Sequence, residues 1–299
     1  MDLKLPFGLK NGQLVQVSDV ESGLNCGCSC PACGDSLVAR KGKIKIHHFA
    51  HHNSDCIHGF ETAIHLAAKK IIEEAGYIRL PKLECTIISG RQNFSFDETV
   101  VHFDKIYLEK RHHDIVPDIV LEKDGRILCV EIFVTHKVDE EKRTKIRQSN
   151  TSAIEIDLSE IDRTIDFELL KEKVVESAEN KEWIFNSSFD SKRSALHKLV
   201  LENSMKKDMI QRGMATHIDY CPIRIRVWQG KPYANFIDDC IGGCKNFVMP
   251  KGNFKDDWLG KGFDYTEDGM IYCIGHKTDE EINKILNGNT ATEKDTVSS

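Results

Sequence analysis

The chain has no apolar run that approaches the roughly 18 residues of a membrane-spanning helix. Its first residues, Met1–Gly8, also lack the apolar core of a signal peptide. These two absences predict a cytoplasmic protein with no membrane partner. An excess of positive charge is missing as well, because the formal net charge is −6. That value argues against a protein that coats DNA non-specifically.

Cysteine is scarce in the middle of the chain, where Cys85 and Cys129 each lie in an apolar context. The other cysteines form two groups. The first group consists of Cys26, Cys28, Cys30, Cys33 and Cys56, and the second of Cys221, Cys240, Cys244 and Cys273. Disulfides explain neither group well in a chain without a secretion signal. The distribution predicts two metal sites on either side of a cysteine-poor region.

The first cysteine group contains a Cys-Pro-Ala-Cys turn, which is followed by a His-Phe-Ala-His run and then by another cysteine. Structural zinc takes four soft ligands, commonly as two close pairs. The predicted ligands are Cys30, Cys33, His51 and Cys56. Cys28 and His48 are alternative ligands. A redox pair is the rival interpretation of the turn, but no strand-then-helix unit precedes it.

The second cysteine group follows an apparent hairpin between Ile223 and Phe236. Its four members, Cys221, Cys240, Cys244 and Cys273, are able to close a zinc ribbon. Their spacing is looser than in the usual paired turns, so buried free cysteines are the alternative. In both interpretations the module is structural.

The cysteine-poor middle contains an Asp124-Gly125 dipeptide between two apolar runs, which predicts a hairpin with a two-residue type I′ turn. In that register Asp118 faces Glu131. Directly opposite residues have Cβ atoms about 4.5–5.5 Å apart, and like charges there destabilise a sheet. A divalent cation compensates such a pair, and Mg²⁺ is usually held by two carboxylates with water and phosphate oxygens. The pair therefore points to metal-assisted phosphodiester chemistry.

Hydrophobic periodicity predicts mixed α/β structure around a central sheet. A helix over 61–75 ends at Gly76, several strands and the hairpin follow, and a helix over 140–148 leads into a strand over 152–158. With 299 residues the chain is long enough for two or more units. The predicted parts are a zinc-binding module (1–58), a central domain (59–164), a helical connector (165–215), a cysteine-rich zinc-ribbon-like module (216–287) and a disordered polar tail (288–299).

Two kinds of residue outside the hairpin are candidates for the same site. Glu61 and His65 are four residues apart and share one face of the first helix, although an exposed glutamate at a helix start is the alternative for Glu61. Basic residues form two local blocks. The candidate phosphate contacts are Arg40, Lys41, Lys43, Lys45, Lys145 and Arg147. A solvated face is the commoner meaning of any one block.

The motif order resembles the competence protein CoiA-like family. Cys-Pro-x-Cys, a basic stretch, His-Phe-Ala-His and then Glu61-x-x-x-His65 and Lys69 carry this resemblance, and Pro117-Asp118 followed by Glu131 is similar to a PD-(D/E)XK nuclease core. The resemblance covers roughly residues 10–160. It implies a restriction-endonuclease-like fold, DNA as substrate, catalytic Mg²⁺ or Mn²⁺, and a role in DNA uptake and recombination or in defence. Recombination or defence proteins are the further partners that it implies.

One position departs from the nuclease pattern. The pattern places a lysine two residues after the second acid, where this chain has Phe133. Lys137 lies about 20 Å further along the strand. Lys142 falls between Val138 and Ile146 on the sheet-facing stripe of the next helix, and a buried lysine is rare unless paired.

We therefore expect Lys142 to reach the carboxylates and position the attacking water. In this mechanism Asp118 and Glu131 hold the metal ion, and Glu61 orients the same ion or a second one.

Two other classes of protein are alternatives. The first is a DNA-binding adaptor with a nuclease-like fold and lapsed chemistry, which Phe133 favours. The second is a zinc hydrolase that uses the cluster His47, His48, His51 and His52, although no His-Glu-x-x-His helix is present. The strandedness of the DNA, the choice between endo- and exonucleolytic cleavage, and the oligomeric state are left open by the sequence.

Overall fold

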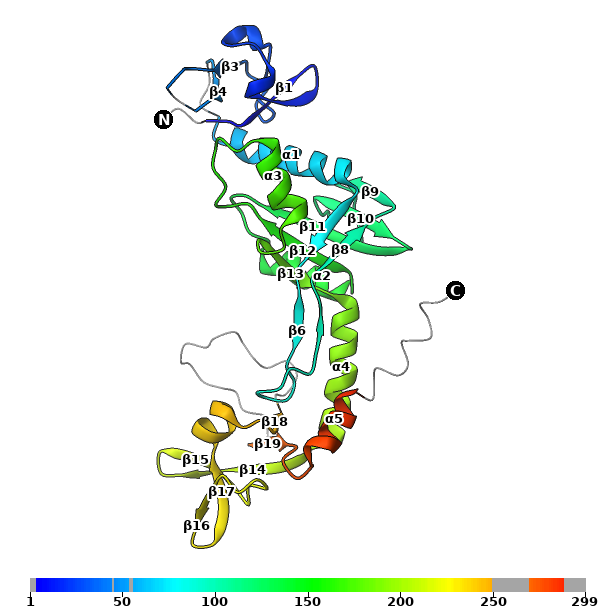
Figure 1. Cartoon of the computed structure of the whole chain (residues 1–299), viewed down its shortest axis with the longest axis vertical. Coiled ribbons are helices and arrows are strands. Elements are labelled where there is room, and N and C mark those ends of the chain that lie inside the picture. The colour runs from blue at the N-terminus through cyan, green and yellow to red at the C-terminus, as the bar shows by residue number, and fades with distance from the viewer. Residues whose placement is uncertain (1–3, 45, 54–55, 249–268, 288–299) are drawn as a thin grey trace. The chain divides into compact units, whose positions relative to one another are not determined.

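The computed structural model describes residues 4–44, 46–53, 56–248 and 269–287. Figure 1 traces the chain, which divides into two compact units. The first unit comprises Met1–Lys82 and Asp97–Ser187, and the second comprises Leu83–Phe96 and Ser188–Ser299. Within the described ranges, no helix is long and apolar enough to cross a membrane. The predicted tail 288–299 lies outside the described residues.

The first unit begins with two small antiparallel hairpins and two short 3-10 turns. The hairpins are β1 (Phe7–Lys10) with β2 (Gln13–Gln16), and β3 (Leu37–Arg40) with β4 (His48–His51). The turns are η1 (Val17–Asp19) and η2 (Leu24–Cys26). Phe7 and Phe49 are fully buried and belong to the same hydrophobic cluster as the first helix. The core thus continues across the boundary that we predicted at residue 58.

Helix α1 (Gly59–Ala75) has the apolar stripe expected from the sequence. Ile64, Ala68 and Ile71 are buried on it. Gly76 ends the helix in a left-handed conformation with φ 71°, and its N–H donates to the Ile72 carbonyl. A side chain with a Cβ is strained at that φ, so glycine stops the helix there.

The central sheet of the first unit has five strands in the order β13-β12-β11-β10-β9. Their bounds are β9 (Lys105–Leu108), β10 (Ile119–Lys123), β11 (Arg126–Phe133), β12 (Ser152–Asp157) and β13 (Lys181–Phe185). A separate pair joins β5 (Tyr77–Leu80) to β8 (Thr99–His102). Strands β11 and β12 are parallel, and all other neighbours are antiparallel. The mixed α/β class is confirmed.

The hairpin β10–β11 has the predicted register, with Lys123 opposite Arg126 and Ile119 opposite Val130. Asp124 and Gly125 both have positive φ, 49° and 73°, as a type I′ turn requires. The turn therefore fixes which side chains share a face of the sheet.

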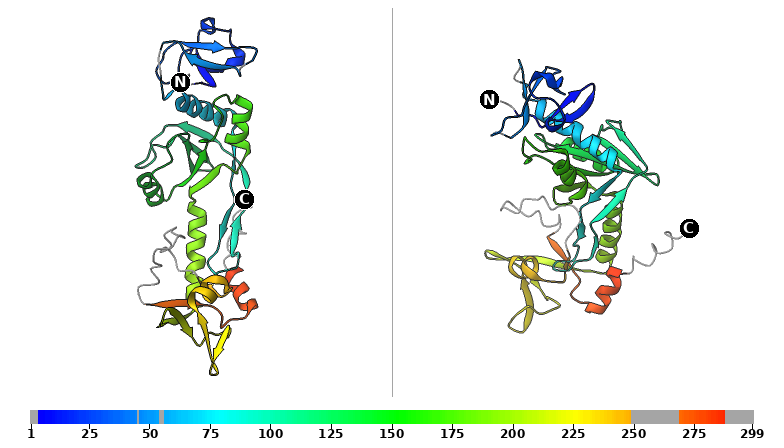
Figure 2. Two further views of the ribbon diagram at one scale, coloured as in Figure 1. Left: turned by 90° about the vertical axis from the view of Figure 1, so that its left-hand side faces the viewer. Right: turned by 45° about the horizontal axis from the view of Figure 1, so that its top comes forward.

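Helices cover both faces of this sheet (Figure 2). Helix α1, helix α3 (Phe167–Lys171) and the π-helical turn η3 (Glu172–Glu176) pack on the face that carries Ile119 and Val130. Helix α2 (Glu140–Gln148) is the crossover between β11 and β12, and its Ile146 packs on the other face against Val120. Helix α2 has the predicted bounds.

The second unit has a six-stranded sheet in the order β16-β17-β15-β14-β19-β18. These strands are β14 (Met205–Arg212), β15 (Ala215–Asp219), β16 (Arg226–Trp228), β17 (Lys231–Asn235), β18 (Phe247–Val248) and β19 (Met270–Cys273). Strands β6 (Leu83–Cys85) and β7 (Phe94–Phe96) form a hairpin. This hairpin packs with helices α4 (Ser187–Glu202) and α5 (Asp279–Asn287) in one hydrophobic cluster. A π-helical turn, η4 (Phe236–Ile241), follows β17.

The segment 165–215, for which we predicted a helical connector, also contains strands. β13 joins the central sheet and β14 joins the second sheet. Helix α4 ends at Glu202, where Asn203 and Ser204 donate side-chain hydrogen bonds to its last turns. β14 then pairs with the distant β19. A pairing partner so far along the chain leaves no local signal in the sequence.

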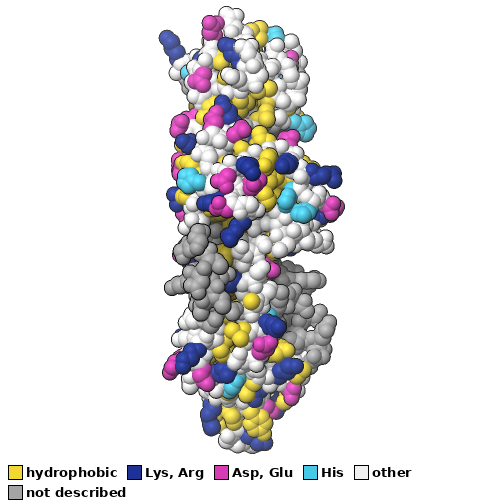
Figure 3. Space-filling model, turned by 90° about the vertical axis from the view of Figure 1, so that its right-hand side faces the viewer, with side chains coloured by type: hydrophobic (Ala, Val, Ile, Leu, Met, Phe, Trp, Pro, Cys, Tyr) yellow, Lys and Arg dark blue, Asp and Glu magenta, His cyan; other side chains and the backbone are white. Residues whose placement is uncertain are grey.

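Charge is mixed on the surface drawn in Figure 3. Lys and Arg side chains there are interspersed with Asp and Glu, and no large area of one sign is visible on this face. This agrees with a chain of net charge −6. On this face, phosphate recognition would rely on local groups and not on a broad basic surface.

Candidate active site and zinc site

The four predicted zinc ligands come together in the first unit. The ligand atoms of Cys30, Cys33, His51 and Cys56 all lie within 4.8 Å of one another. The Nε2 atom of His51 is buried and has no hydrogen-bond partner, which is the arrangement of a nitrogen that faces a cation. The Ala32 N–H donates to Cys30 Sγ at 3.4 Å, as in turns that stabilise a thiolate. These residues could hold a structural zinc ion.

The alternative ligands have other roles. The Cys28 thiol lies 3.5 Å from the Cys26 carbonyl, and His48 Nδ1 lies 2.9 Å from the Ile46 carbonyl. His47 and His52 are exposed. Of the histidines that we considered for a zinc hydrolase, His51 alone belongs to a metal-ligand group in the described part of the chain. The geometry thus supports a closed structural site.

The second cysteine group is also brought together, but more loosely. Cys221, Cys240, Cys244 and Cys273 are buried and line the same small cavity in the second unit. Among the described residues, the 4.8 Å grouping of ligand atoms is met by the first group alone. The sulfurs of the second group therefore lie further apart.

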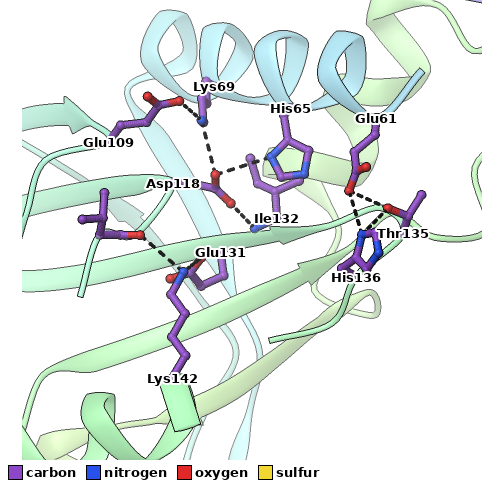
Figure 4. A network of polar contacts seen from close by, with 11 residues as sticks. Glu61, His65, Lys69, Glu109, Asp118, Glu131, Ile132, Thr135, His136 and Lys142 are labelled. Carbon is purple, nitrogen blue, oxygen red and sulfur yellow. Dashed lines mark hydrogen bonds and ion pairs between the residues drawn. The ribbon is translucent and has the colours of Figure 1, made fainter. Parts of the chain in front are cut away.

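The carboxylates of Asp118 and Glu131 lie at the open end of the β10–β11 hairpin (Figure 4). Asp118 Oδ2 accepts a hydrogen bond of 2.9 Å from the backbone N–H of Ile132. Its Oδ1 lies 3.4 Å from His65 Nδ1 and 3.3 Å from Lys69 Nζ, both on α1. The Asp118 carboxylate is therefore held by contacts with strand β11 and with helix α1.

The environment of Asp118 keeps it ionised. Burial alone would raise the pKa of this carboxyl, but the hydrogen bond and charge of His65, the Ile132 N–H and Lys69 outweigh it. Together they lower the pKa of Asp118 to about 2. At neutral pH this group is a permanent anion.

The pKa of Glu131, in contrast, is raised. Its side chain is 5% exposed, and its Oε2 accepts a hydrogen bond of 2.7 Å from Lys142 Nζ. Burial raises the pKa of Glu131 to about 7 against the attraction of Lys142, and the charge of Asp118 raises it further. The other oxygen, Oε1, is buried without a hydrogen-bond partner. A buried carboxylate oxygen with no partner is costly unless a cation or water faces it.

Lys142 reaches the site from α2, as the helical spacing predicts. Asp139 caps this helix by accepting a hydrogen bond from the Lys142 N–H at 2.7 Å. The ammonium also donates to the Val116 carbonyl at 3.3 Å. By contrast, the Nζ atom of Lys137 pairs with other acids. It lies 3.1 Å from Glu182 Oε2 and 3.8 Å from Glu155 Oε2. Phe133 is half-buried and supplies no charge.

Glu61 is the third acid near this site. Its Oε1 accepts a hydrogen bond of 2.5 Å from the Thr135 hydroxyl and lies 3.4 Å from His136 Nδ1. Burial opposes ionisation of Glu61, but these two partners outweigh it and lower its pKa. Glu61, His65 and Lys69 follow at four-residue spacing on one face of α1.

Several residues of the site carry no recognisable signal in the sequence. Thr135 and His136 follow β11 without any recognisable motif. Arg143 is buried and pairs with Glu155 at 3.1 Å, and Glu155 is aligned with Glu131 on the parallel strands. Lys69, which belongs to the motif that carries the family resemblance, lies four residues after His65 on the same helical face, and this spacing indicates its place beside Asp118.

The predicted phosphate contacts do not form one cluster. Lys145 pairs with Glu141 at 2.6 Å, and Arg147 lies 3.9 Å from Glu140. Lys41 donates to the Ser18 carbonyl at 3.0 Å. Arg40 and Lys43 are exposed, and Lys45 lies outside the described residues. Of these groups, Lys145 and Arg147 share helix α2 with Lys142.

Comparison with known families gives one match. Residues 21–59 match the family described as Competence protein CoiA, N-terminal domain. These residues include the whole predicted zinc set, so the resemblance to the CoiA-like family is confirmed over this part of the chain. No curated protein and no solved structure matches.

Proposed function

We propose that this protein is a metal-dependent nuclease that hydrolyses phosphodiester bonds in DNA. The observation that supports this best is the buried, unpartnered Oε1 of Glu131 beside an ionised Asp118. Two carboxylates together with water and phosphate oxygens are a typical magnesium site. The restriction-endonuclease-like fold belongs to the same proposal, and the mixed sheet with its β11–β12 parallel pair agrees with it.

The residues present fit a divalent ion. Asp118 and Glu131 would hold Mg²⁺ or Mn²⁺, and Glu61 would orient the ion or its water. When bound, such an ion polarises a phosphoryl oxygen and lowers the pKa of a coordinated water. His65 and Lys69 keep Asp118 in its anionic form.

Lys142 takes the role of the lysine that the strand lacks. Its ammonium is held beside Glu131 by a hydrogen bond to that carboxylate and by one to the Val116 carbonyl. From this position it can orient a water for attack on phosphorus and neutralise the charge that develops on the phosphoryl oxygens. Preorganised charge of this kind contributes mainly in the transition state and little to DNA binding.

The match of residues 21–59 to a competence protein domain supports a role in DNA uptake and recombination. Defence against foreign DNA would use the same chemistry. The zinc site would hold the N-terminal module in shape, and the exposed Arg40 and Lys43 are candidates for backbone contacts.

A second function is favoured by one observation. Both carboxylates already have basic partners in the chain itself, Lys69 beside Asp118 and Lys142 beside Glu131. A site whose two acids already have basic partners without a metal ion is what a DNA-binding adaptor with lapsed chemistry would retain. This alternative predicts DNA binding that is independent of Mg²⁺ and Mn²⁺.

One assay separates the two functions. Linear double-stranded, circular and single-stranded DNA are each incubated with the protein and Mg²⁺ or Mn²⁺, and DNA binding is measured in parallel. We expect cleavage of at least one substrate, its loss with a chelator that spares zinc, and its loss in Glu131→Gln. Metal-independent binding without cleavage of any substrate would reject the nuclease in favour of the adaptor.

A further inference from the structure

We propose that Cys221, Cys240, Cys244 and Cys273 form a second structural zinc site, in the second unit and independent of the nuclease chemistry. The four cysteines come from four different places in that unit. Cys221 follows β15, Cys240 lies in η4, Cys244 precedes β18, and Cys273 ends β19. All four nevertheless line one cavity and are buried, with 5–8% exposure.

The backbone around these cysteines has the geometry that supports thiolates. The Gly275 N–H donates to Cys273 Sγ at 3.4 Å, which is the same two-residue offset and distance as from Ala32 to Cys30 in the first site. The Phe247 N–H donates to the Cys244 carbonyl at 3.2 Å and closes the turn after this cysteine. Donors directed at sulfur stabilise its anionic form, the form that binds metal. Packing of neutral thiols alone does not explain why both sites have an N–H donor to sulfur two residues after a cysteine.

The turns that carry the sulfurs also pack on one another. A Cβ on Gly275 would lie 3.1 Å from atoms of both Pro222 and Ile223, directly after Cys221, and 3.4 Å from Cys273 Sγ. Glycine thus allows the Cys221 and Cys273 turns to approach closely. Two cysteine turns placed face to face are the usual framework of a closed four-cysteine site.

The core around the second group is small. Its buried members are Ile218, Cys221, Ala234, Phe236, Cys240, Cys244, Phe247 and Ile271. Exposed apolar residues, including Val227 and Trp228, lie on the adjacent hairpin instead of filling this core. A small scaffold with so few large buried side chains commonly needs a disulfide or a metal for stability. All four cysteines are free thiols, so no disulfide supplies this stability, and a bound metal ion would.

The sulfurs of the second group lie further apart than those of the first site. Zinc binding would draw them together. Zn–S bonds of about 2.3 Å bring four sulfurs within about 4 Å of one another. With four thiolates and no open position, the site would be structural. It would connect η4 and the loop before β18 to β15 and β19.

Zinc content of the full-length protein tests the proposal. We expect about two zinc ions per chain, and about one in Cys273→Ser and in Cys33→Ser. Cys85→Ser is the matched control, because Cys85 is a buried cysteine of the same unit outside the cavity, and it should keep both ions. A single zinc ion in the wild type that Cys273→Ser retains and Cys33→Ser loses would overturn the proposal.

A second measurement covers variants that fail to fold. Thiol alkylation of the wild-type protein, mapped by mass spectrometry with and without a zinc chelator, follows each cysteine separately. Chelation should make all four cysteines of the second group reactive and leave Cys85 protected. If the four show the same protection with and without the chelator, no metal holds them.

Discussion

At the scale of single residues, the candidate active site is defined by two carboxyl groups in opposite states. The pKa of Asp118 is lowered to about 2 by His65, the Ile132 N–H and Lys69, while burial raises the pKa of Glu131 to about 7. Near neutral pH one group is always charged and the other exchanges its proton. Because a metal ligand must be deprotonated, Glu131 controls when the site can bind a cation.

Metal binding should therefore increase with pH. A proton competes with the ion for Glu131 below pH about 7, so Mn²⁺ affinity should rise toward that pH and level off above it. Titration of Mn²⁺ at a series of pH values by electron paramagnetic resonance measures this directly. Glu131→Gln removes the competing proton and should bind weakly at every pH. An affinity that is already constant between about pH 5 and 8 would contradict the prediction.

The same group should make the metal-free protein less stable as the pH rises. The folded-state pKa of about 7 lies above the ordinary 4.5, so the unfolded chain releases the proton first and stability falls between these two pH values. The full difference corresponds to at most about 3 kcal/mol. We expect Glu131→Gln to exceed the wild type in urea unfolding at pH 8, with the difference nearly gone at pH 4. An unchanged difference at the two pH values would show that burial of Glu131 has no such effect.

Lys142 should be essential for cleavage and dispensable for binding. Removing its charge in Lys142→Met should lower the cleavage rate by about 10²–10³-fold, because the ammonium acts on developing charge, while the Kd for DNA changes little. Lys145→Met is the control, since Lys145 pairs with Glu141 on the surface of the same helix. It should weaken binding modestly and in a salt-dependent way. Full cleavage activity of Lys142→Met would show that Lys142 does not supply the catalytic charge.

At the scale of elements, helix α2 determines where Lys142 points. Asp139 caps its first turn, and Arg143, next to Lys142, is buried and pairs with Glu155 on β12. Glu155 and Glu131 are aligned on neighbouring parallel strands. Two consecutive basic residues of the helix thus face two adjacent acids of the sheet, and this fixes the rotation of the helix.

Breaking the Arg143–Glu155 pair should cost stability and activity together. Arg143→Met leaves Glu155 buried with its Val138 N–H bond and the more distant Lys137, and loss of one buried partner costs about 3–5 kcal/mol. Urea unfolding measures this. The double variant Arg143→Met/Glu155→Leu removes both charges and should recover most of that loss. If it is no more stable than Arg143→Met, the pair does not behave as a coupled ion pair.

Local signals in the sequence were sufficient for several elements. The Asp124-Gly125 turn determines the hairpin register, helical spacing places Lys142 beside Glu131, and the two ligand pairs give the first zinc set. Other features depend on distant parts of the chain. The β14–β19 pairing and the contact of Glu61 with Thr135 are of this kind. No periodicity or turn motif encodes either one.

At the scale of the whole molecule, the N-terminal zinc module and the elements of the candidate active site share one hydrophobic core. Phe7 and Phe49 from the N-terminal hairpins lie in the same cluster as Ile64 of α1 and Val130 of β11. Loss of zinc should therefore destabilise the whole first unit and not only residues 21–59.

Chelation of zinc should lower the Tm of the protein, because the binding free energy of a structural site contributes to folding. Thermal unfolding followed by circular dichroism, with and without chelator, measures the shift. Added zinc should restore the Tm, and added magnesium is the control that should not. A Tm that is insensitive to zinc removal, verified by metal analysis, would mean that packing alone holds the module.

The place of Lys142 has a consequence for how such sites are found in other sequences. The lysine follows Glu131 by 11 residues and is carried on a crossover helix instead of on the strand. A search pattern that requires lysine two residues after the acid rejects this chain at Phe133. A pattern that joins the acid strand to a capped helix with two consecutive basic residues in its first turn would retain it.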